Sequence, residues 1–135
     1  MEIRRYTQAD EAALMALIEG EGEDWACYWA PDAAENYKRL LMRSITYVAY
    51  EEGVLCGYSR AYMDGDLYIF VLDLLVTKAY RGRETGRQLM EQLYRDYTRH
   101  TVYVLSGVDG YYSKLGYQKE GSIYAVNRPG QPDDL

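Results

Sequence analysis

The sequence predicts an α/β fold in which helices cover both faces of a mixed, mainly antiparallel central sheet. Three β-rich runs follow one another between residues 45 and 76, which is the pattern of an antiparallel meander. A strand, a helix and another strand follow over residues 67–105, and this order places the last strand parallel to its neighbour. The run 67–76 is apolar on both pleat faces apart from Asp73, so we expect a central strand covered on each side.

The N-terminal elements are a short strand and two helices. Residues 3–6 read as a strand, and Thr7 with Asp10 three residues later gives an N-cap signal for the first helix. The apolar stripe of that helix consists of Ala13, Leu14, Leu17 and Ile18. Gly20 ends this helix, and a second helix is expected over residues 33–43.

The remaining elements alternate between strands and helices. A hairpin turn signal, Glu51-Glu52-Gly53, separates the first two strands of the meander. An amphipathic helix follows the basic loop 81–87, and a short helix over 109–115 is stopped by Gly116. The strands expected here are 45–50, 54–61, 67–76, 101–105, 117–119 and 122–127.

The composition is that of one compact domain, which we expect over residues 1–128, followed by a frayed tail over 129–135. Of the 135 residues, 48% are apolar and 27% are charged, which suffices for a core. The longest apolar stretch, 67–72, is far below the ~18 residues that a bilayer span needs. Because the N-terminus also lacks the apolar core of a secretory signal, we expect a cytoplasmic protein that does not contact a membrane.

Rare residues and net charge argue against several functions. Cys27 and Cys56 are the two cysteines, too few for a four-cysteine zinc site, and without the spacing of a redox pair they are expected to be buried thiols. His100 is the single histidine, which weakens the metalloenzyme and Ser-His-Asp hydrolase hypotheses, and no metal is expected. A net charge of −6 repels nucleic acid and suits a cationic partner.

The segment 81–87 has the features of an anion site. It places three arginines and two glycines between a buried strand and a helix N-terminus, where free N–H groups and the helix dipole favour a pyrophosphate. The segment lacks the Gly-Lys-Ser/Thr of a Walker loop. Gly82 and Gly86 form GxxxG rather than the GxGxxG of a dinucleotide fold, so both of those nucleotide sites are disfavoured.

Two segments resemble the signatures of the GNAT superfamily of acetyl-CoA-dependent N-acetyltransferases. Within residues 73–89, Arg81 and Gly86 occupy the first and last positions of its acetyl-CoA loop, Arg/Gln-x-x-Gly-x-Gly/Ala. Residues 111–117, Tyr-Tyr-Ser-Lys-Leu-Gly-Tyr, are similar to its second signature, aromatic-Tyr-x-Lys-x-Gly-Phe/Tyr. The element order also matches that family's fold, so the resemblance covers nearly the whole chain.

The resemblance implies a set of acetyl-CoA-binding residues and shows one departure from the family pattern. The implied residues are Leu74, Val76, Arg81, Gly82, Arg83, Thr85, Gly86 and Arg87. Glu84 stands where the family has its first glycine, which places a carboxylate where the backbone would approach the pyrophosphate. We expect this side chain to point outward and to pair with Arg81 or Arg87, since the three arginines still leave a local charge of about +2.

The resemblance also implies that an amine attacks the thioester directly in a ternary complex. The main-chain N–H of Val76 would hold the thioester carbonyl. Tyr112 matches the general acid that protonates the departing CoA thiolate, while Tyr111 is expected to pack inward because adjacent helix positions face different directions. Asp73 is the candidate base, since it is the lone ionisable group in a buried run. The alternative is that Asp73 is satisfied by neighbouring backbone at a β-bulge.

Residues 19–32 are expected to form a loop and are the candidate acceptor site. The loop combines aromatic rings with carboxylates: Trp25, Tyr28 and Trp29 with Glu21, Glu23 and Asp24. A site lined in this way would bind a cation through cation–π contact with the rings and through attraction to the carboxylates. The alternative is an acidic, solvated loop that its tryptophans fasten to the core.

We therefore expect an N-acetyltransferase that moves an acetyl group from acetyl-CoA to a primary amine of a small molecule or peptide. The alternative is a CoA-binding regulatory module of the same fold without turnover, which Glu84 favours; another acyl group or an alcohol acceptor is a third possibility. The expected partners are acetyl-CoA and a cationic amine, with no nucleic acid, and the chain is expected to be a monomer or a homodimer.

Overall fold

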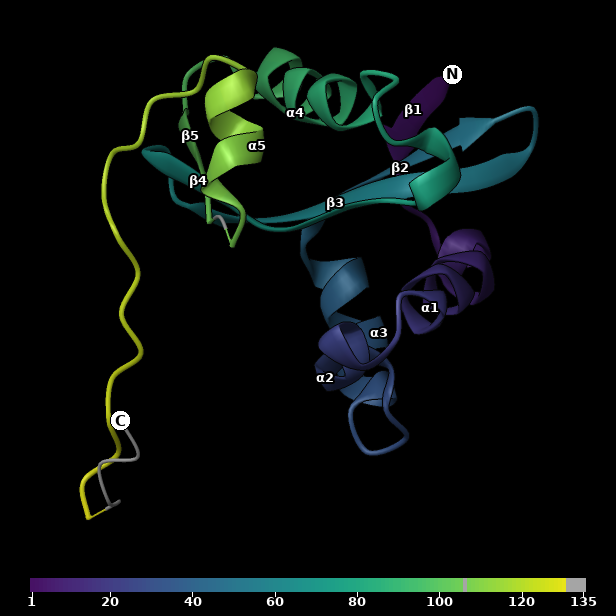
Figure 1. Cartoon of the computed structure of the whole chain (residues 1–135), viewed down its shortest axis with the longest axis horizontal. Coiled ribbons are helices and arrows are strands. Elements are labelled where there is room, and N and C mark those ends of the chain that lie inside the picture. The colour runs from purple at the N-terminus through teal and green to yellow at the C-terminus, as the bar shows by residue number, and fades with distance from the viewer. Residues whose placement is uncertain (106, 131–135) are drawn as a thin grey trace. The chain divides into compact units, whose positions relative to one another are not determined.

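A five-stranded sheet lies at the centre of residues 1–104, in the order β1-β2-β3-β4-β5 (Figure 1). Its strands are β1 (Glu2–Arg5), β2 (Ile45–Glu51), β3 (Val54–Asp64), β4 (Tyr68–Val76) and β5 (Thr101–Val104). Neighbours from β1 to β4 are antiparallel, and β5 is parallel to β4. This computed structural model describes residues 1–105 and 107–130. The predicted mixed, mainly antiparallel sheet is confirmed.

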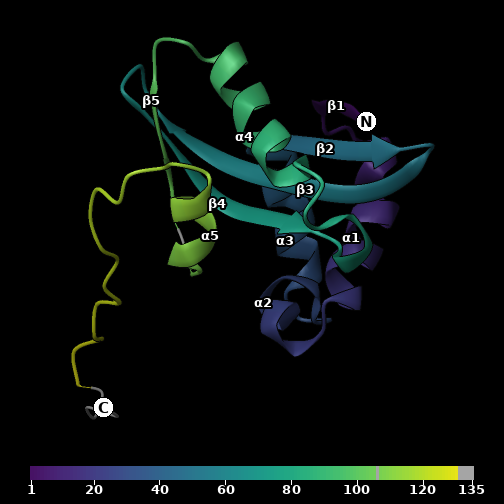
Figure 2. The ribbon, with the colours of Figure 1, turned by 45° about the horizontal axis from the view of Figure 1, so that its top comes forward.

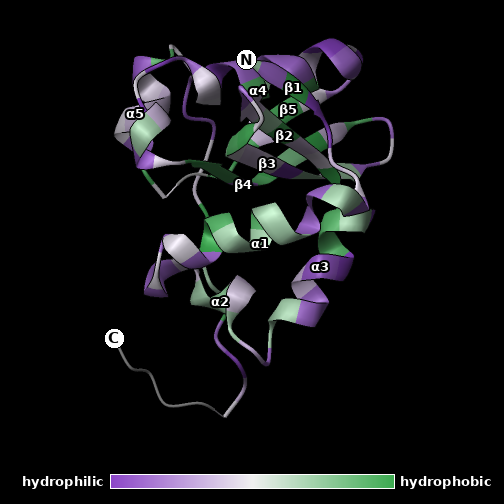
Figure 3. Cartoon of the chain, turned by 90° about the vertical axis from the view of Figure 1, so that its right-hand side faces the viewer, coloured by the Kyte–Doolittle hydropathy of each residue, from purple (hydrophilic) through white to green (hydrophobic). Residues whose placement is uncertain are grey.

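Helices cover both faces of the sheet, as predicted (Figures 1 and 2). The helices of this part of the chain are α1 (Glu11–Gly20), α2 (Ala26–Trp29), α3 (Ala34–Arg43) and α4 (Thr85–Asp96). On one face, Leu89 and Leu93 of α4 pack with Val71 of β4. On the other, helices α1 and α3 pack against the sheet in a second core cluster that includes Tyr58 and Leu75. Hydrophobic residues are concentrated in the strands and on α1 (Figure 3).

A β-bulge in β4 decides which side chains share a face. Arg60 of β3 pairs with Asp73, but the next residue, Ala61, pairs with Val71, so Leu72 is the extra residue of the bulge. Because one inserted residue reverses the alternation of side chains, Val71 faces α4 while Asp73 lies on the opposite face. The bulge therefore brings Asp73 to the tyrosine-rich face that α2 and α3 cover.

The segment 19–32 is more ordered than predicted. It contains a 3-10 helix, Glu23–Trp25, and the short helix α2, so the prediction of a plain loop is wrong. Its aromatic rings pack on the core and thereby stabilise these turns, an effect that helix periodicity does not reveal over so few residues. Cys27 of α2 is exposed, contrary to the prediction of two buried thiols, whereas Cys56 is buried as expected.

The residues from Leu105 onward form a second unit, whose described part contains the helix α5 (Asp109–Lys114). As predicted, Gly116 ends the helix, with a positive φ of 86° that favours glycine. The strands expected over 117–119 and 122–127 are not formed. A strand exists only where its backbone groups pair with a neighbour, and the described residues of this segment have no such pairing.

The chain end and the helix lengths complete the description. Residues 129–130 lie in a turn, and the rest of the predicted frayed tail, 131–135, lies outside the described residues. No helix in the described part of the chain has the length and apolar character that crossing a bilayer requires.

Candidate active site

The C-terminal half of β4 presents main-chain groups that no strand of the described residues pairs. The amide of Thr77 donates to the carbonyl of Cys56 at 2.9 Å, and Val76 is the register partner of Gly57. In an antiparallel ladder this pattern makes Gly57 and Val76 a non-hydrogen-bonded pair, so the N–H groups of Val76 and Leu74 point away from β3. On that side β5 pairs only with Tyr68–Val71. The predicted donor, the N–H of Val76, thus lies on an unpaired strand edge.

The N-terminus of α4 follows this edge after one short turn, the 3-10 helix Lys78–Tyr80. The first backbone hydrogen bond of the helix runs from the N–H of Gln88 to the carbonyl of Glu84. The three N–H groups before it, those of Thr85, Gly86 and Arg87, therefore have no partner within the helix. The Thr85 hydroxyl is buried and has no hydrogen-bond partner among the described residues. Free amides, a helix dipole and an orphaned hydroxyl together suit an anionic group.

Arg81 links this loop to two neighbours. Its Nε donates to the carbonyl of Val76 at 2.8 Å, and its guanidinium lies 3.3 Å from the carboxylate of Glu21 at the end of α1. In the same loop, the Arg83 guanidinium lies 5.3 Å from the centre of the Tyr80 ring. The eight residues that are predicted to bind acetyl-CoA lie at the end of β4, in the turn that follows it and in the first turn of α4. Sequence reasoning missed Glu21 as the partner of Arg81, because 60 residues separate the two.

Glu84 adopts the left-handed conformation, with φ at 67°, directly before α4. This backbone shape explains why glycine belongs at the position, since a side chain there is strained. The Glu84 side chain is 61% exposed and pairs with Arg87. The expected outward orientation is confirmed, with Arg87 rather than Arg81 as the partner.

Replacing Glu84 with glycine is expected to raise the free energy of unfolding by about 1 kcal/mol, because the left-handed strain disappears. It should also strengthen acetyl-CoA binding, since Arg87 loses a competing carboxylate. Denaturant unfolding and calorimetry measure the two effects. Glu52→Gly is the matched control, because Glu52 also has a positive φ, 49°, and belongs to the β2–β3 turn. The control should gain stability without a change in affinity; weaker acetyl-CoA binding by Glu84→Gly would contradict the outward orientation.

Asp73 is the centre of a buried network. Its Oδ2 accepts from the Tyr37 hydroxyl at 2.7 Å and from the Arg60 Nε at 2.6 Å, while its Oδ1 accepts from the Tyr28 hydroxyl at 2.6 Å. Burial lowers the pKa of Arg60, but the Asp73 carboxylate outweighs this and raises it overall. Asp73 does lie at a β-bulge, yet these partners are side chains rather than backbone. That Asp73 acts as the base stays a prediction.

The partners of Asp73 were not predicted from the sequence, although the sequence around one of them, Arg60, indicates a buried ion pair. Arg60 is the only charged residue in the strand run 54–61, just as Asp73 is in 67–76. A lone charge in each of two adjacent strands is a pattern that favours a buried pair. Nothing comparable marks Tyr37 or Tyr58 among 16 tyrosines.

The predicted acceptor residues pack against the core and remain partly exposed. The Tyr28 ring stacks on Tyr37 with 4.2 Å between centroids, and the Trp25 ring meets the Tyr58 ring edge-on at 6.4 Å. The indole N–H of Trp29 donates to the carbonyl of Gly22 at 2.9 Å. These contacts are those of rings that fasten the segment to the core, the alternative stated above. Binding of an amine by these rings stays a prediction.

Tyr112, the predicted general acid, lies on α5 in the second unit. Its ring stacks on Tyr117 at 6.2 Å and meets Tyr111 edge-on at 5.0 Å. Burial, together with the neighbouring phenols, raises the pKa of Tyr112 to about 12. The phenol therefore stays protonated at neutral pH and can donate a proton. Tyr111 is 39% exposed, so the expectation that it packs inward is wrong: α5 turns that position outward.

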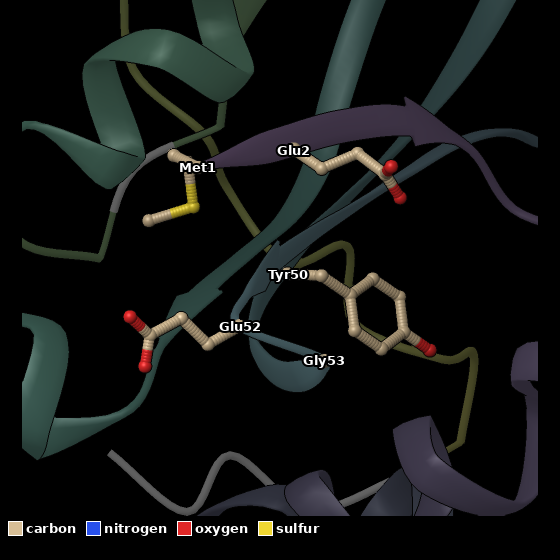
Figure 4. A pocket seen from close by; sticks show the side chains of 5 residues that line it. All are labelled: Met1, Glu2, Tyr50, Glu52 and Gly53. Carbon is tan, nitrogen blue, oxygen red and sulfur yellow. The ribbon is translucent and has the colours of Figure 1, made fainter.

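A separate shallow pocket lies by β1 and the β2–β3 hairpin (Figure 4). It is lined by Met1, Glu2, Tyr50, Glu52 and Gly53, and it includes none of the predicted site residues. The described residues contain no group of three histidines, cysteines or carboxylates that could hold a metal ion. We place the candidate site at the end of β4 and the start of α4, because the unpaired strand edge, the free amides and the Thr85 hydroxyl lie there.

A mixed sheet with an unpaired strand edge beside the free N–H groups of a helix N-terminus is the arrangement of a domain that can hold an anionic ligand. The family model of the acetyltransferase (GNAT) domain matches residues 42–119, more than half of the chain. The chain belongs to the GNAT acetyltransferase family, which confirms the resemblance seen in the sequence and its assignment as an acyltransferase. A search of curated proteins finds no match.

Solved structures have the same fold. A GNAT family acetyltransferase from Streptococcus pneumoniae TIGR4 has a TM-score of 0.73 at 20% identity, covering 94% of this chain and 98% of that one. An aminoglycoside acetyltransferase from an uncultured soil metagenomic sample has a TM-score of 0.71 at 24% identity, covering 94% and 97%. The aminoglycoside N-acetyltransferase AAC(6')-Iy, solved with the bisubstrate analogue CoA-S-monomethyl-acetylneamine, has a TM-score of 0.72 at 18% identity, covering 94% and 97%.

Proposed function

We propose that this protein transfers an acetyl group from acetyl-CoA to a primary amine of a small molecule or peptide, by direct attack in a ternary complex. The observation that carries the proposal is the unpaired edge of β4, which runs directly into the N-terminus of α4. The pyrophosphate would bind the free amides of α4 with help from Arg81, Arg83 and Arg87, and the Val76 N–H would polarise the thioester carbonyl. Tyr112 would then protonate the departing thiolate.

The acceptor proposed for this site is cationic. The net charge of −6 attracts cations, and the segment before α2 carries Glu21, Glu23 and Asp24. Solved neighbours described as aminoglycoside acetyltransferases, one of them with a bisubstrate analogue, support an amine acceptor. We place the enzyme in the cytoplasm, as a monomer or homodimer.

The proposed function is tested by the release of free CoA thiol from acetyl-CoA in the presence of amines. A panel of polyamines, amino acids, aminoglycosides and a peptide N-terminus should contain at least one acceptor that accelerates release above the rate with buffer alone. Preference for an anionic acceptor would contradict the charge argument. Binding of acetyl-CoA in calorimetry without thiol release for any amine would favour the second candidate, a CoA-binding module without turnover, which the glutamate at position 84 supports.

Arg81→Ala is expected to weaken acetyl-CoA binding by about tenfold or more and to give a shallower salt dependence, because it removes one charged partner of the pyrophosphate. Calorimetry at two salt concentrations measures both effects. Arg95→Ala is the control, since it removes the same charge from the other end of α4, where Arg95 pairs with Glu91. Equal affinity of Arg81→Ala and the unmodified protein would refute the assignment of the loop.

A further inference from the structure

The directions of the hydrogen bonds around Asp73 follow from proton counting. An ionised carboxylate can only accept, and each phenol has one proton to give. Tyr37 gives its proton to Asp73, so in the 2.6 Å contact between the Tyr37 and Tyr58 hydroxyls the donor must be Tyr58. By the same rule, Tyr28 gives its only proton to Asp73. The oxygen of Tyr28 is therefore left as an acceptor alone.

Access to this network runs through Tyr28. Of the three side chains that donate to Asp73, Tyr37 and Arg60 are 2% and 7% exposed, and Tyr28 alone is half-buried. A general base must come within hydrogen-bond reach of the proton that it removes. Of the side chains bonded to Asp73, Tyr28 is therefore the one that an amine arriving from solvent can contact.

Two contacts hold the Tyr28 side chain close to the proposed thioester site. Its ring is held against Tyr37 by stacking, and its hydroxyl is held by Asp73, whose neighbour Leu74 directs an N–H to the unpaired edge of β4. Burial, followed by the bond to Asp73, raises the pKa of Tyr28 to about 12, so the group is a neutral phenol at neutral pH. A neutral oxygen with free lone pairs is a suitable partner for the N–H groups of an ammonium.

We propose that Tyr28 binds the acceptor through its phenolic oxygen, which accepts a hydrogen bond from the ammonium group, and that Asp73 is a positioning residue that aims this oxygen. Arg60 and Tyr37 hold Asp73 in turn, so the buried network keeps Tyr28 as an acceptor. This inference rests on the proposed acetyl transfer. It gives Asp73 a role that acts through Tyr28, in place of direct removal of the amine's proton.

The test compares steady-state kinetics of the unmodified protein and Tyr28→Phe, using the best acceptor of the amine panel. Tyr28→Phe should raise the KM for the amine about tenfold, the loss of one hydrogen bond to a charged group, and leave kcat, its pH profile and the KM for acetyl-CoA within a few-fold. A fall of a hundredfold or more in kcat would overturn the proposal, because it would mean that Tyr28 relays the proton to Asp73. An unchanged amine KM would also overturn it, since Tyr28 would then only pack.

Asp73→Asn in the Tyr28→Phe background isolates the part that Asp73 contributes. A residue that acts only through Tyr28 adds no further rise in the amine KM once that hydroxyl is gone, and the pH profile should not change. A lost limb of the pH profile would identify Asp73 as the base and overturn its positioning role. If the double variant does not fold, the kcat and the amine KM of Tyr28→Phe alone still support or overturn the proposal.

Two controls separate the possible failures. Tyr94→Phe removes the hydroxyl of an exposed tyrosine on α4 and should leave the amine KM unchanged, because α4 packs in the other core cluster, away from Tyr28. A tenfold rise in the amine KM of this control would show that the loss of any tyrosine hydroxyl disturbs the acceptor, which would refute a specific role of Tyr28. Absence of thiol release by the unmodified protein with every amine would refute the proposed function itself, whereas turnover with unchanged kinetics in Tyr28→Phe refutes only the present inference.

Discussion

Replacing Tyr112 with phenylalanine is expected to lower kcat by roughly 10²–10⁴-fold and to leave the acetyl-CoA dissociation constant within a few-fold. The hydroxyl is needed only when the thiolate departs, and the remaining ring keeps its stacking on Tyr117. Stopped-time assays of thiol release measure kcat, and calorimetry measures the affinity.

The pH dependence of this variant provides a second measurement. The pKa of Tyr112 is raised to about 12, so the phenol remains a proton donor at every pH below that value. The deficit of Tyr112→Phe should therefore be largest above the thiol pKa of about 8.5, where the departing thiolate does not readily take a proton from water.

Tyr111→Phe is the internal control for Tyr112. The Tyr111 ring meets that of Tyr112 edge-on but is exposed, so loss of its hydroxyl should change kcat much less. Near-normal kcat of Tyr112→Phe across the pH range would reduce Tyr112 to a packing residue.

Arg60→Ala is expected to lower the free energy of unfolding by about 3–5 kcal/mol, because it leaves the buried Asp73 without its cationic partner. The guanidinium also lies 5.2 Å from the centre of the Tyr37 ring, a contact that the variant loses. Such a loss is large against the total of about 5–15 kcal/mol that is typical of a folded domain. Urea or guanidinium unfolding measures the change.

Two variants show whether burial causes this effect. Arg95→Ala breaks an exposed pair with Glu91 and should cost less than about 1 kcal/mol. Arg60→Lys keeps the charge but loses the planar guanidinium, and should lie between the two. If Arg60→Ala cost no more than Arg95→Ala, the Arg60–Asp73 pair would contribute nothing measurable to stability.

Most helices and strands could be predicted from local patterns because the sequence encodes them within a few residues. Helical stripes predicted α1, α3 and α4, and alternation with turn signals predicted the strands from β1 to β5. Asp73 was identified as unusual for a similar reason, since a carboxylate in an apolar strand is costly unless it is paired or used. The two signatures, around Arg81 and Tyr112, are sufficient to identify the family, because each is a short run of neighbouring residues.

Features that depend on distant partners could not be predicted in this way. The expected strands after residue 117 failed because a strand needs a neighbouring edge, which its own alternation does not provide. The bulge at Leu72 decides which face Asp73 occupies, and it exists only in the register of β4 against β3. The outward exposure of Cys27 and Tyr111 likewise depends on how short helices pack.

The amino-acid sequence was sufficient for the fold class, the family and the order of the main elements as far as α5, because hydrophobic periodicity and motif spacing are local properties of a chain. The tertiary structure decided how those residues are used. It revealed the left-handed backbone at Glu84, the pairing of Arg81 with Glu21, and the network through which Asp73 holds Tyr28. Each of these arises when segments far apart in sequence come within hydrogen-bond distance or impose a dihedral angle, and that geometry is set only by the packing of the whole chain.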